Sequence, residues 1–238
     1  MANKGYRHPS VASAPVRIYT RKGDDGTTGL LYGGRVAKDS WRIETNGAVD
    51  EAQAALGLAR AEAEPGSELD EMLVALERDL YVLMAEVATA PANRRKLTPG
   101  VSLVTGDMVS ALEQRIDDLS GRFPPIKDFV IPGHDRVSAT LDVARTATRR
   151  AERAALRVFP AGPADSSRSD ETAGSAMLPE DSPEPEQTAD VANPDRDGQV
   201  SQSHVVRYLN RLSDLLWTMA RWQESGDSLL SRKASPTR

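Results

Sequence analysis

Two segments of this 238-residue chain carry residue types suited to holding phosphate. The first is the sequence TRKGDDGTTG at residues 20–29. Its backbone amides, its threonine hydroxyls and the adjacent Arg21 and Lys22 are groups that bind phosphate oxygens. It lacks the GK[ST] ending of a P-loop and follows no predicted strand, so it is not an ordinary P-loop. The alternative interpretation is that GDDG forms a plain solvent-exposed turn.

The second segment is a row of arginines. Arg145, Arg149 and Arg153 recur every four residues, with Arg150 and Glu152 beside them. Residues four apart lie on one side of a helix, where Arg145 borders the predicted apolar face. One interpretation is a solvated basic face on which Glu152 offsets part of the charge. The other is a site where a bound polyphosphate relieves the repulsion between the arginines.

Few other residues are spaced for chemistry. The chain has no cysteine, which excludes disulfides, zinc–thiolate sites and thiol nucleophiles. Its three histidines are His8, His134 and His204, and their spacing matches neither a catalytic triad nor a metal-binding set. We therefore expect no protein-held metal site and no histidine general base.

The charge of the chain is unevenly distributed. The formal net charge is −5, yet residues 161–203 alone hold ten acidic residues and two arginines. The remainder is therefore mildly basic, with basic residues concentrated at 17–42 and 145–157. This pattern favours a polyanionic ligand. Nucleic acid is a weaker candidate, because neither cluster is interleaved with aromatic residues or shows a groove-reading pattern.

Five segments have the apolar spacing of amphipathic helices, at about residues 40–64, 68–90, 105–119, 135–159 and 203–224. Asp39 or Ser40 can cap the first. Residues 19–34 are predicted to form a loop, and FPPIKDFVIPG at 123–133 a rigid connection. No segment is predicted as a strand, so the fold class is all-α, a five-helix bundle. No apolar run has the roughly 20 residues of a membrane helix.

A single helical-bundle domain is expected over residues 17–160 and 204–226. Residues 161–203 are rich in Pro, Ser, Asp and Glu, which predicts a disordered acidic insertion. Residues 1–16 are expected to be a flexible N-terminus and residues 227–238 a flexible C-terminal tail. The first seventeen residues include three basic residues and no acid, which weakly resembles a transit peptide. A frayed N-terminus of a cytoplasmic protein is the preferred interpretation.

Five pieces of the sequence, taken in order, resemble the PduO-type ATP:cob(I)alamin adenosyltransferase family. They are YTRKGDDGTTGL, RVAKDSWRIETNGAVDEAQAALGLAR, LEQRIDDL with PPIKDFVIPG, ARTATRRAERAA, and YLNRLSDLLWTMAR. The resemblance covers nearly all of residues 17–159 and 205–223. Each piece alone is modest evidence, whereas the ordered set is highly specific.

The resemblance implies a homotrimer of helical bundles that binds ATP in a cleft between neighbouring subunits. The implied reaction moves the 5′-deoxyadenosyl group of ATP to the cobalt of cob(I)alamin, which gives adenosylcobalamin and triphosphate. Mg2+ is expected to bind through the ATP phosphates. A cob(II)alamin reductase and an adenosylcobalamin-dependent mutase are the implied protein partners. The alternative function is a non-catalytic carrier that delivers adenosylcobalamin to a mutase.

The resemblance also implies roles for individual residues. Asp50 would pair with Arg145 across the subunit boundary, and Phe129 matches the aromatic residue that crowds the lower face of the corrin and keeps the lower ligand off cobalt. The remaining assigned residues would bind ATP, and they are Thr20, Arg21, Lys22, Gly23, Thr28, Lys38, Arg149, Arg150, Glu152, Arg153 and Asn210.

The chain departs from the family pattern in three places. His134 follows Pro132 and Gly133 where many members have PGG, and Asp142 stands where they have a histidine before ART. The acidic insertion is not a general feature of the family. A phosphotransferase or nucleotide hydrolase is a third reading, which the absence of a Walker lysine and of an obvious carboxylate base opposes.

Overall fold

The structure is a computed structural model, and it describes residues 18–160, 203–225 and 228–231. The expected flexible N-terminus at 1–16, residues 161–202 of the acidic insertion and residues 232–238 of the tail lie outside the described residues. Everything below concerns the described ranges.

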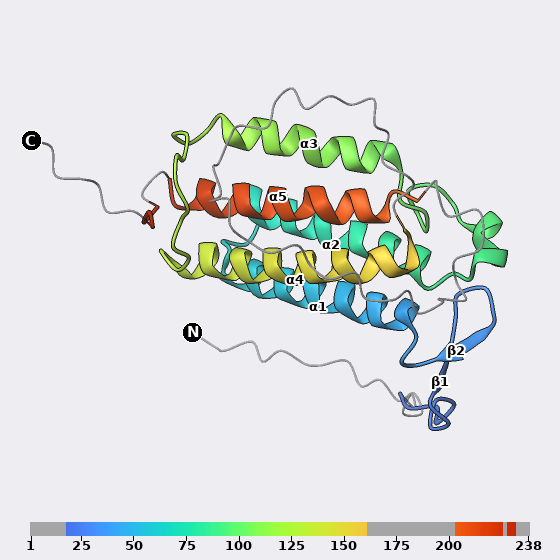
Figure 1. Cartoon of the computed structure of the whole chain (residues 1–238). Helices are drawn as coiled ribbons and strands as arrows, with labels where there is room; N and C mark the ends of the chain where they lie inside the picture. The colour runs from blue at the N-terminus through green and yellow to red at the C-terminus, as the bar shows by residue number, and fades with distance from the viewer. Residues whose placement is uncertain (1–17, 161–202, 226–227, 232–238) are drawn as a thin grey trace, which may run out of the picture.

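Five α-helices form the body of the molecule (Figure 1). Helix α4 packs against both α1 and α5, α2 packs on α1, and α3 packs on the outer side of α5. The prediction of a mostly helical bundle is confirmed, and each predicted helix is present with ends shifted by a few residues. The helices are α1 (Trp41–Glu62), α2 (Glu68–Val87), α3 (Gly106–Ser120), α4 (Arg136–Val158) and α5 (Val205–Gln223).

The core combines two kinds of seam. Small side chains line the contact between α1 and α4, which lets these two backbones approach closely, whereas leucines fill the space between α2 and α5. Burying one such leucine stabilises the fold by about 1.5–3 kcal/mol. The fully buried residues include Ala52 and Ala59 on α1, Ala144 and Ala151 on α4, Leu76 and Leu80 on α2, and Leu209 and Leu216 on α5.

Local caps fix where α3 and α4 begin. The Thr105 hydroxyl accepts a hydrogen bond from the backbone N–H of Met108 at 3.2 Å. Asp135 and Ser138 form a reciprocal capping box at the start of α4, which satisfies two backbone donors that a helix end leaves open. At α1, Ser40 is the N-cap residue, as one of the two predicted candidates, but its side chain makes no capping bond.

The expectation of no strand was wrong. Residues of the predicted loop form β1 (Thr27–Gly29), which pairs antiparallel with β2 (Arg35–Ala37), so that Thr28 faces Val36. Strands of three residues are too short to show an alternating pattern in the sequence, and Gly33 and Gly34 adopt φ of 101° and 94° in the turn. The basic stretch after α2 also forms a 3-10 helix, η1 (Pro91–Lys96).

Part of the predicted C-terminal tail contacts the connection between α3 and α4. The backbone N–H of Ile131 donates to the carbonyl of Leu229 at 2.7 Å, and that of Ser231 donates to the carbonyl of Phe129 at 2.8 Å. Residues 229–231 thereby run antiparallel to residues 129–131. Among the described helices, none is both long and apolar enough to cross a membrane.

Candidate active site

The β1–β2 hairpin gathers the loop residues that were predicted to bind phosphate. Lys38 follows β2 directly, and its backbone N–H donates to the carbonyl of Gly26 at 2.9 Å. Its side chain lies so close to Gly23 that a Cβ on this glycine would stand 2.9 Å from Lys38 Nζ. Any larger residue at position 23 would therefore displace the lysine. The hairpin brings Lys38 into the loop, although fifteen positions separate it from Gly23 in the sequence.

Arg35 is a member of this loop that sequence reasoning missed. Its guanidinium donates to the carbonyl of Lys22 at 2.5 Å and to the hydroxyl of Thr27 at 2.5 and 2.9 Å. Asp25 accepts from the backbone N–H and the hydroxyl of Thr27, and these bonds, the backbone one first, lower the pKa of the Asp25 carboxyl. The strand pairing, which the sequence does not reveal, places Arg35 opposite Gly29, and from there its side chain reaches Thr27.

The loop presents its cationic side chains to solvent. Arg21 is exposed, has φ of 59°, and stacks its guanidinium 5.4 Å from the ring of Tyr19. Lys22 is exposed as well, and its backbone N–H donates weakly to the Thr20 hydroxyl at 3.4 Å. Thr28 lies within β1 and is half-buried. The loop thus combines a hydrogen-bonded backbone with solvent-exposed cations, which suits an anionic ligand.

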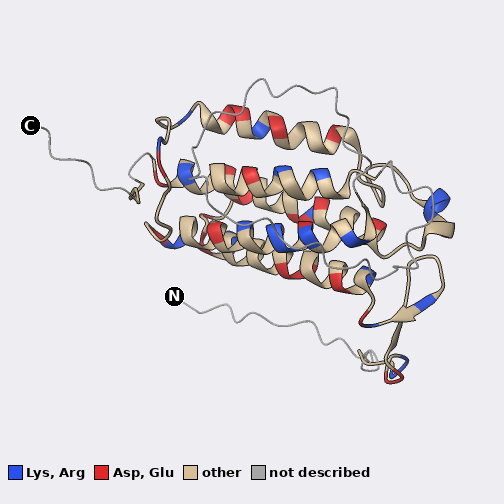
Figure 2. Cartoon of the chain, viewed as in Figure 1, with Lys and Arg blue, Asp and Glu red and all other residues tan. Residues whose placement is uncertain are grey.

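The arginine row lies on α4, where basic segments recur along the helix (Figure 2). Arg149 and Arg153 are exposed and make no hydrogen bond or ion pair within the described residues. Arg150 differs, because it pairs with Glu51 of α1. Among the described residues, Arg149 and Arg153 therefore have no ion pair, although the charge of Arg149 opposes the rise in the pKa of the Asp214 carboxyl, whereas Arg150 is paired with Glu51.

Helix α5 adds a polar cluster next to this row. Asn210 donates from Nδ2 to Glu152 Oε1 at 3.0 Å and accepts from Arg211 at 2.5 Å, so it joins α5 to α4. Burial raises the pKa of the nearby Asp214 carboxyl, an effect that the Arg211 charge opposes and the Glu152 charge adds to. The two residues predicted to flank the nucleotide, Glu152 and Asn210, are in direct contact.

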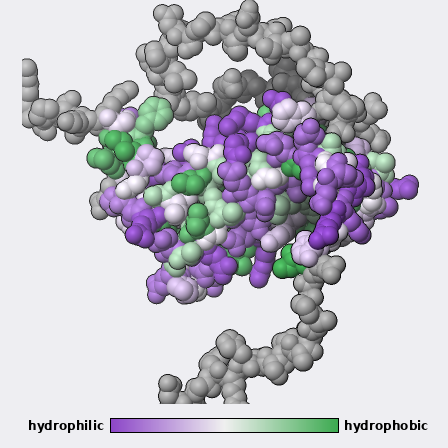
Figure 3. All heavy atoms as spheres, turned by 90° about the horizontal axis from the view of Figure 1, so that it is seen from below, coloured by the Kyte–Doolittle hydropathy of each residue, from purple (hydrophilic) through white to green (hydrophobic). Residues whose placement is uncertain are grey.

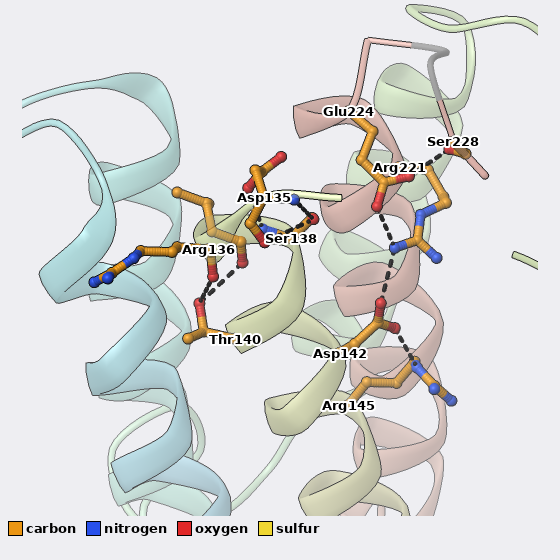
Figure 4. A network of polar contacts seen from close by, with 10 residues as sticks. Asp135, Arg136, Ser138, Thr140, Asp142, Arg145, Arg221, Glu224 and Ser228 are labelled. Carbon is orange, nitrogen blue, oxygen red and sulfur yellow. Dashed lines mark hydrogen bonds and ion pairs between the residues drawn. The ribbon is translucent and has the colours of Figure 1, made fainter. Parts of the chain in front are cut away.

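The predicted partners Asp50 and Arg145 do not meet within one chain. Asp50 is exposed on α1 and forms no ion pair among the described residues. Arg145 is half-buried and donates from Nε to Asp142 Oδ1 at 3.1 Å (Figure 4). Asp142 therefore occupies one nitrogen of the arginine that was expected to face another subunit.

The connection between α3 and α4, which contains Phe129, and the glycine-rich loop lie at opposite ends of the bundle (Figure 1). The loop leads into α1, whose Trp41 ring lies 3.7 Å from the Arg157 guanidinium at the end of α4. Phe129 precedes the start of α4 and is 69% exposed. The 23 residues of α4 span about 35 Å at 1.5 Å per residue. One chain alone does not bring the loop and Phe129 together.

The described residues contain no group of three or more histidines and carboxylates arranged to hold a metal ion.

The helices α1 and α4 expose single apolar residues, such as Trp41, Leu58 and Val143, between charged ones. Seen from below, the surface accordingly mixes hydrophobic and hydrophilic side chains (Figure 3).

The fold and this site define a helical-bundle protein with a braced glycine-rich loop at one end and unmatched arginines on its central helix. The model of the cobalamin adenosyltransferase family matches residues 18–173. The chain belongs to this family.

Named relatives agree with this assignment. A corrinoid adenosyltransferase of Citrobacter freundii is 36% identical over 209 residues, which covers 88% of this chain and 96% of that protein. The corrinoid adenosyltransferase of Mycobacterium bovis is 34% identical over 224 residues, with 90% and 97% covered. That of Bacillus subtilis is 33% identical over 210 residues, with 87% and 86% covered.

Solved structures share the fold. A variant of the PduO-type ATP:corrinoid adenosyltransferase from Lactobacillus reuteri, complexed with cobalamin and ATP, superposes with a TM-score of 0.67. It is 23% identical, and the match covers 91% of this chain and all of that one. A second variant of the same protein, complexed with ATP, has a TM-score of 0.66.

Proposed function

We propose that this chain is an ATP:corrinoid adenosyltransferase. The lone pair of Co(I) in cob(I)alamin forms a bond to C5′ of ATP while the bond from C5′ to the triphosphate oxygen breaks. The electron pair of that bond leaves with triphosphate, and the products are adenosylcobalamin and triphosphate. The observation that carries the proposal is the pairing of a braced, cationic glycine-rich loop with two unmatched arginines in a member of this family.

The side chains of this site suit a reaction that develops negative charge on a leaving group. Lys22 and Lys38 on the loop and Arg149 and Arg153 on α4 supply cations for the triphosphate, where fixed cations are most effective. A general base is not needed, because cob(I)alamin is itself a strong nucleophile. Glu152 is engaged by Asn210, so its role is to orient the ATP site. Magnesium would bridge the phosphate oxygens and offset their charge.

A complete site requires more than one copy of the chain. The connection between α3 and α4, which contains Phe129, and the glycine-rich loop lie at opposite ends of one bundle, so the two can serve one reaction only if neighbouring subunits contribute them. Asp50 and Arg145 likewise remain apart in one chain. We propose a homotrimer in which the loop of one subunit faces the α4 row of the next, with Asp50 and Arg145 paired across the boundary and Phe129 beneath the corrin.

The reaction consumes cob(I)alamin, which must be supplied by one-electron reduction of cob(II)alamin. We therefore propose a reductase as the upstream partner and an adenosylcobalamin-dependent mutase as the consumer of the product. An apolar side chain such as Phe129 aids the reduction if it keeps the lower ligand and water away from cobalt.

An anaerobic assay tests the function directly. The purified protein is mixed with ATP, Mg2+ and chemically reduced cobalamin, and formation of a light-sensitive alkylcobalt species is followed by its absorbance while triphosphate is quantified. We expect the two products in equal amounts and neither in the absence of ATP. Binding of both substrates without turnover would indicate a carrier instead. Phosphate release that does not depend on the corrinoid would indicate a hydrolase.

A further inference from the structure

A buried network of charges joins the N-terminal half of α4 to the C-terminal end of α5 (Figure 4). Arg221 donates from Nη2 to Asp142 Oδ2 and to Glu224 Oε1, both at 2.8 Å. The Ser228 hydroxyl donates to the second oxygen of Glu224. Asp142 uses its other oxygen, Oδ1, to accept from Arg145 Nε at 3.1 Å. The network therefore runs without a break from the residues after α5 to Arg145.

Burial makes this network rigid. Arg221 is 1% exposed, Glu224 2% and Asp142 5%. A charge removed from water is costly unless it is paired and hydrogen-bonded, so each of these groups is held to its partner. Two carboxylates face two guanidiniums, and the set is electrically balanced within the chain. Moving Asp142 would leave the guanidinium of Arg221 short of a partner.

Asp142 fixes Arg145 in a specific way. Among the described residues, the bond to Asp142 is the only hydrogen bond of the Arg145 guanidinium, and it uses Nε. A bond at Nε sets the plane of the group and leaves the two terminal nitrogens available for a carboxylate in the forked geometry that arginine favours. The side chain of Arg145 is 26% exposed. Its Nε is thus held by Asp142, while its two terminal nitrogens remain available to a further acceptor.

The identity of residue 142 matters for this arrangement. A carboxylate has two oxygens and can accept from two arginines at once, whereas a neutral histidine offers one acceptor nitrogen. In this chain Asp142 satisfies Arg221 with one oxygen and Arg145 with the other. A histidine at this position could not do both.

We propose that Asp142 and Arg221 are positioning residues for Arg145. Arg221 holds Asp142 in place from α5, and Asp142 orients the guanidinium of Arg145 toward Asp50 of the neighbouring subunit. This inference rests on the proposed function, in which the Asp50–Arg145 pair shapes the active site. The competing explanation is that the network only fastens α4 to α5.

The test is a double-mutant cycle on the full chain. Asp142→Asn keeps the shape of the side chain but cannot accept from two guanidiniums with full charge. We expect kcat for adenosylcobalamin formation to fall by about tenfold in the otherwise unchanged protein, with the KM for ATP within about twofold. In an Arg145→Lys background the same substitution should cause no further loss, because the group that Asp142 orients is gone.

A matched control separates positioning from fastening. Asp79 accepts a hydrogen bond from the Tyr208 hydroxyl at 2.9 Å and so also links α5 to another helix, but it has no connection to Arg145. Asp79→Asn should leave kcat unchanged. Equal losses from Asp142→Asn in both backgrounds, or no loss in either, would overturn the inference.

Two further outcomes are possible: a variant that does not fold, and an unchanged protein that is inactive. If Asp142→Asn does not fold, Asp142→His is measured in the same cycle, since its single acceptor nitrogen predicts the same background-dependent loss. If the unchanged protein forms no adenosylcobalamin, it is the proposed function that fails. An active protein with additive losses overturns only the positioning role.

Discussion

Helix α4 carries two groups of arginine that differ in how their charge is matched. Arg145, near the middle of the helix, belongs to a buried network in which Asp142 and Glu224 balance it and Arg221. Arg149 and Arg153, one and two turns further on, are exposed and form no hydrogen bond or ion pair among the described residues, although the charge of Arg149 acts on the Asp214 carboxyl. On this one helix, the first group is therefore ion-paired within the chain, whereas the second group is available to a ligand.

The difference shows what each group can do. Charges that are matched inside the chain fix geometry, because rearranging them exposes a buried ion to an apolar environment. Charges that are unmatched at the surface repel one another and gain most from an added anion. We read the matched group as the support of the site and the unmatched group as the part that binds its ligand.

The largest effect on turnover is expected from substitutions of Asp50 and Arg145, the pair proposed to form across the subunit boundary. Asp50→Asn removes the carboxylate that the terminal nitrogens of Arg145 are proposed to bind, and Arg145→Lys removes the forked donor, so each should cut turnover severely. The double variant should be less harmful than the sum of the singles. Turnover of the three variants and their oligomeric state by light scattering provide the measurement.

Additive losses in an intact oligomer would mean that Asp50 and Arg145 do not touch. The arginine of the matched group would then serve only its own chain, and the contrast between the two groups would lose its functional meaning.

The unmatched group should show its effect in binding. Arg149→Ala should weaken ATP binding by about 2 kcal/mol, roughly thirtyfold, if the contact is charge-assisted. Calorimetric titration with ATP measures this, and the exposed Arg207 on α5 offers a control in Arg207→Ala. An ATP affinity equal to that of the unchanged protein would return Arg149 to a solvated basic face.

A smaller effect is expected on the free energy of unfolding, through the carboxyl of Asp214. Burial raises the pKa of Asp214 above its usual value, so the folded state binds a proton more tightly there than the unfolded chain does. The stability linked to this proton is present at low pH and is lost as pH rises from the unfolded value through the raised folded one.

Asp214→Asn removes that dependence. At pH 7 the variant should melt about 1–3 °C above the unchanged protein, because it buries no charge, and the difference should vanish as the pH falls below 4. Thermal melts between pH 3.5 and 7.5 measure it, with the exposed Glu64→Gln as a control. A variant less stable at pH 7 would show that the ion pair of Asp214 with Arg211, at 3.5 Å, outweighs the cost of burying the carboxylate.

The smallest effect is expected from the acidic insertion. Replacing residues 161–202 with a short Gly/Ser linker should leave turnover and ATP affinity within about threefold, because the composition of the segment predicts no packed structure. ATP titrations of both forms provide the measurement. A clear rise in affinity would show that the acidic segment competes for the unmatched arginines, which would then not be open.

The sequence alone was sufficient for the helical class and for locating the two cationic segments. Helix positions follow from local features, namely the spacing of Leu73, Leu76 and Leu80 and breakers such as Pro65 and Pro91, so they could be predicted to within a few residues. The cationic loop and the arginine row were visible for the same reason, since each is a short, continuous pattern.

The tertiary structure decided which of these residues act together. The three-residue strands that bring Lys38 to Gly23 are too short to leave a pattern. The partner of Asp142 is Arg221, 79 positions away, and no periodicity links them. The placement of the connection between α3 and α4, which contains Phe129, and the glycine-rich loop at opposite ends of the bundle depends on how α1 and α4 pack. Contacts of this kind arise from the global packing of helices, whereas sequence patterns report only what neighbouring residues impose on one another.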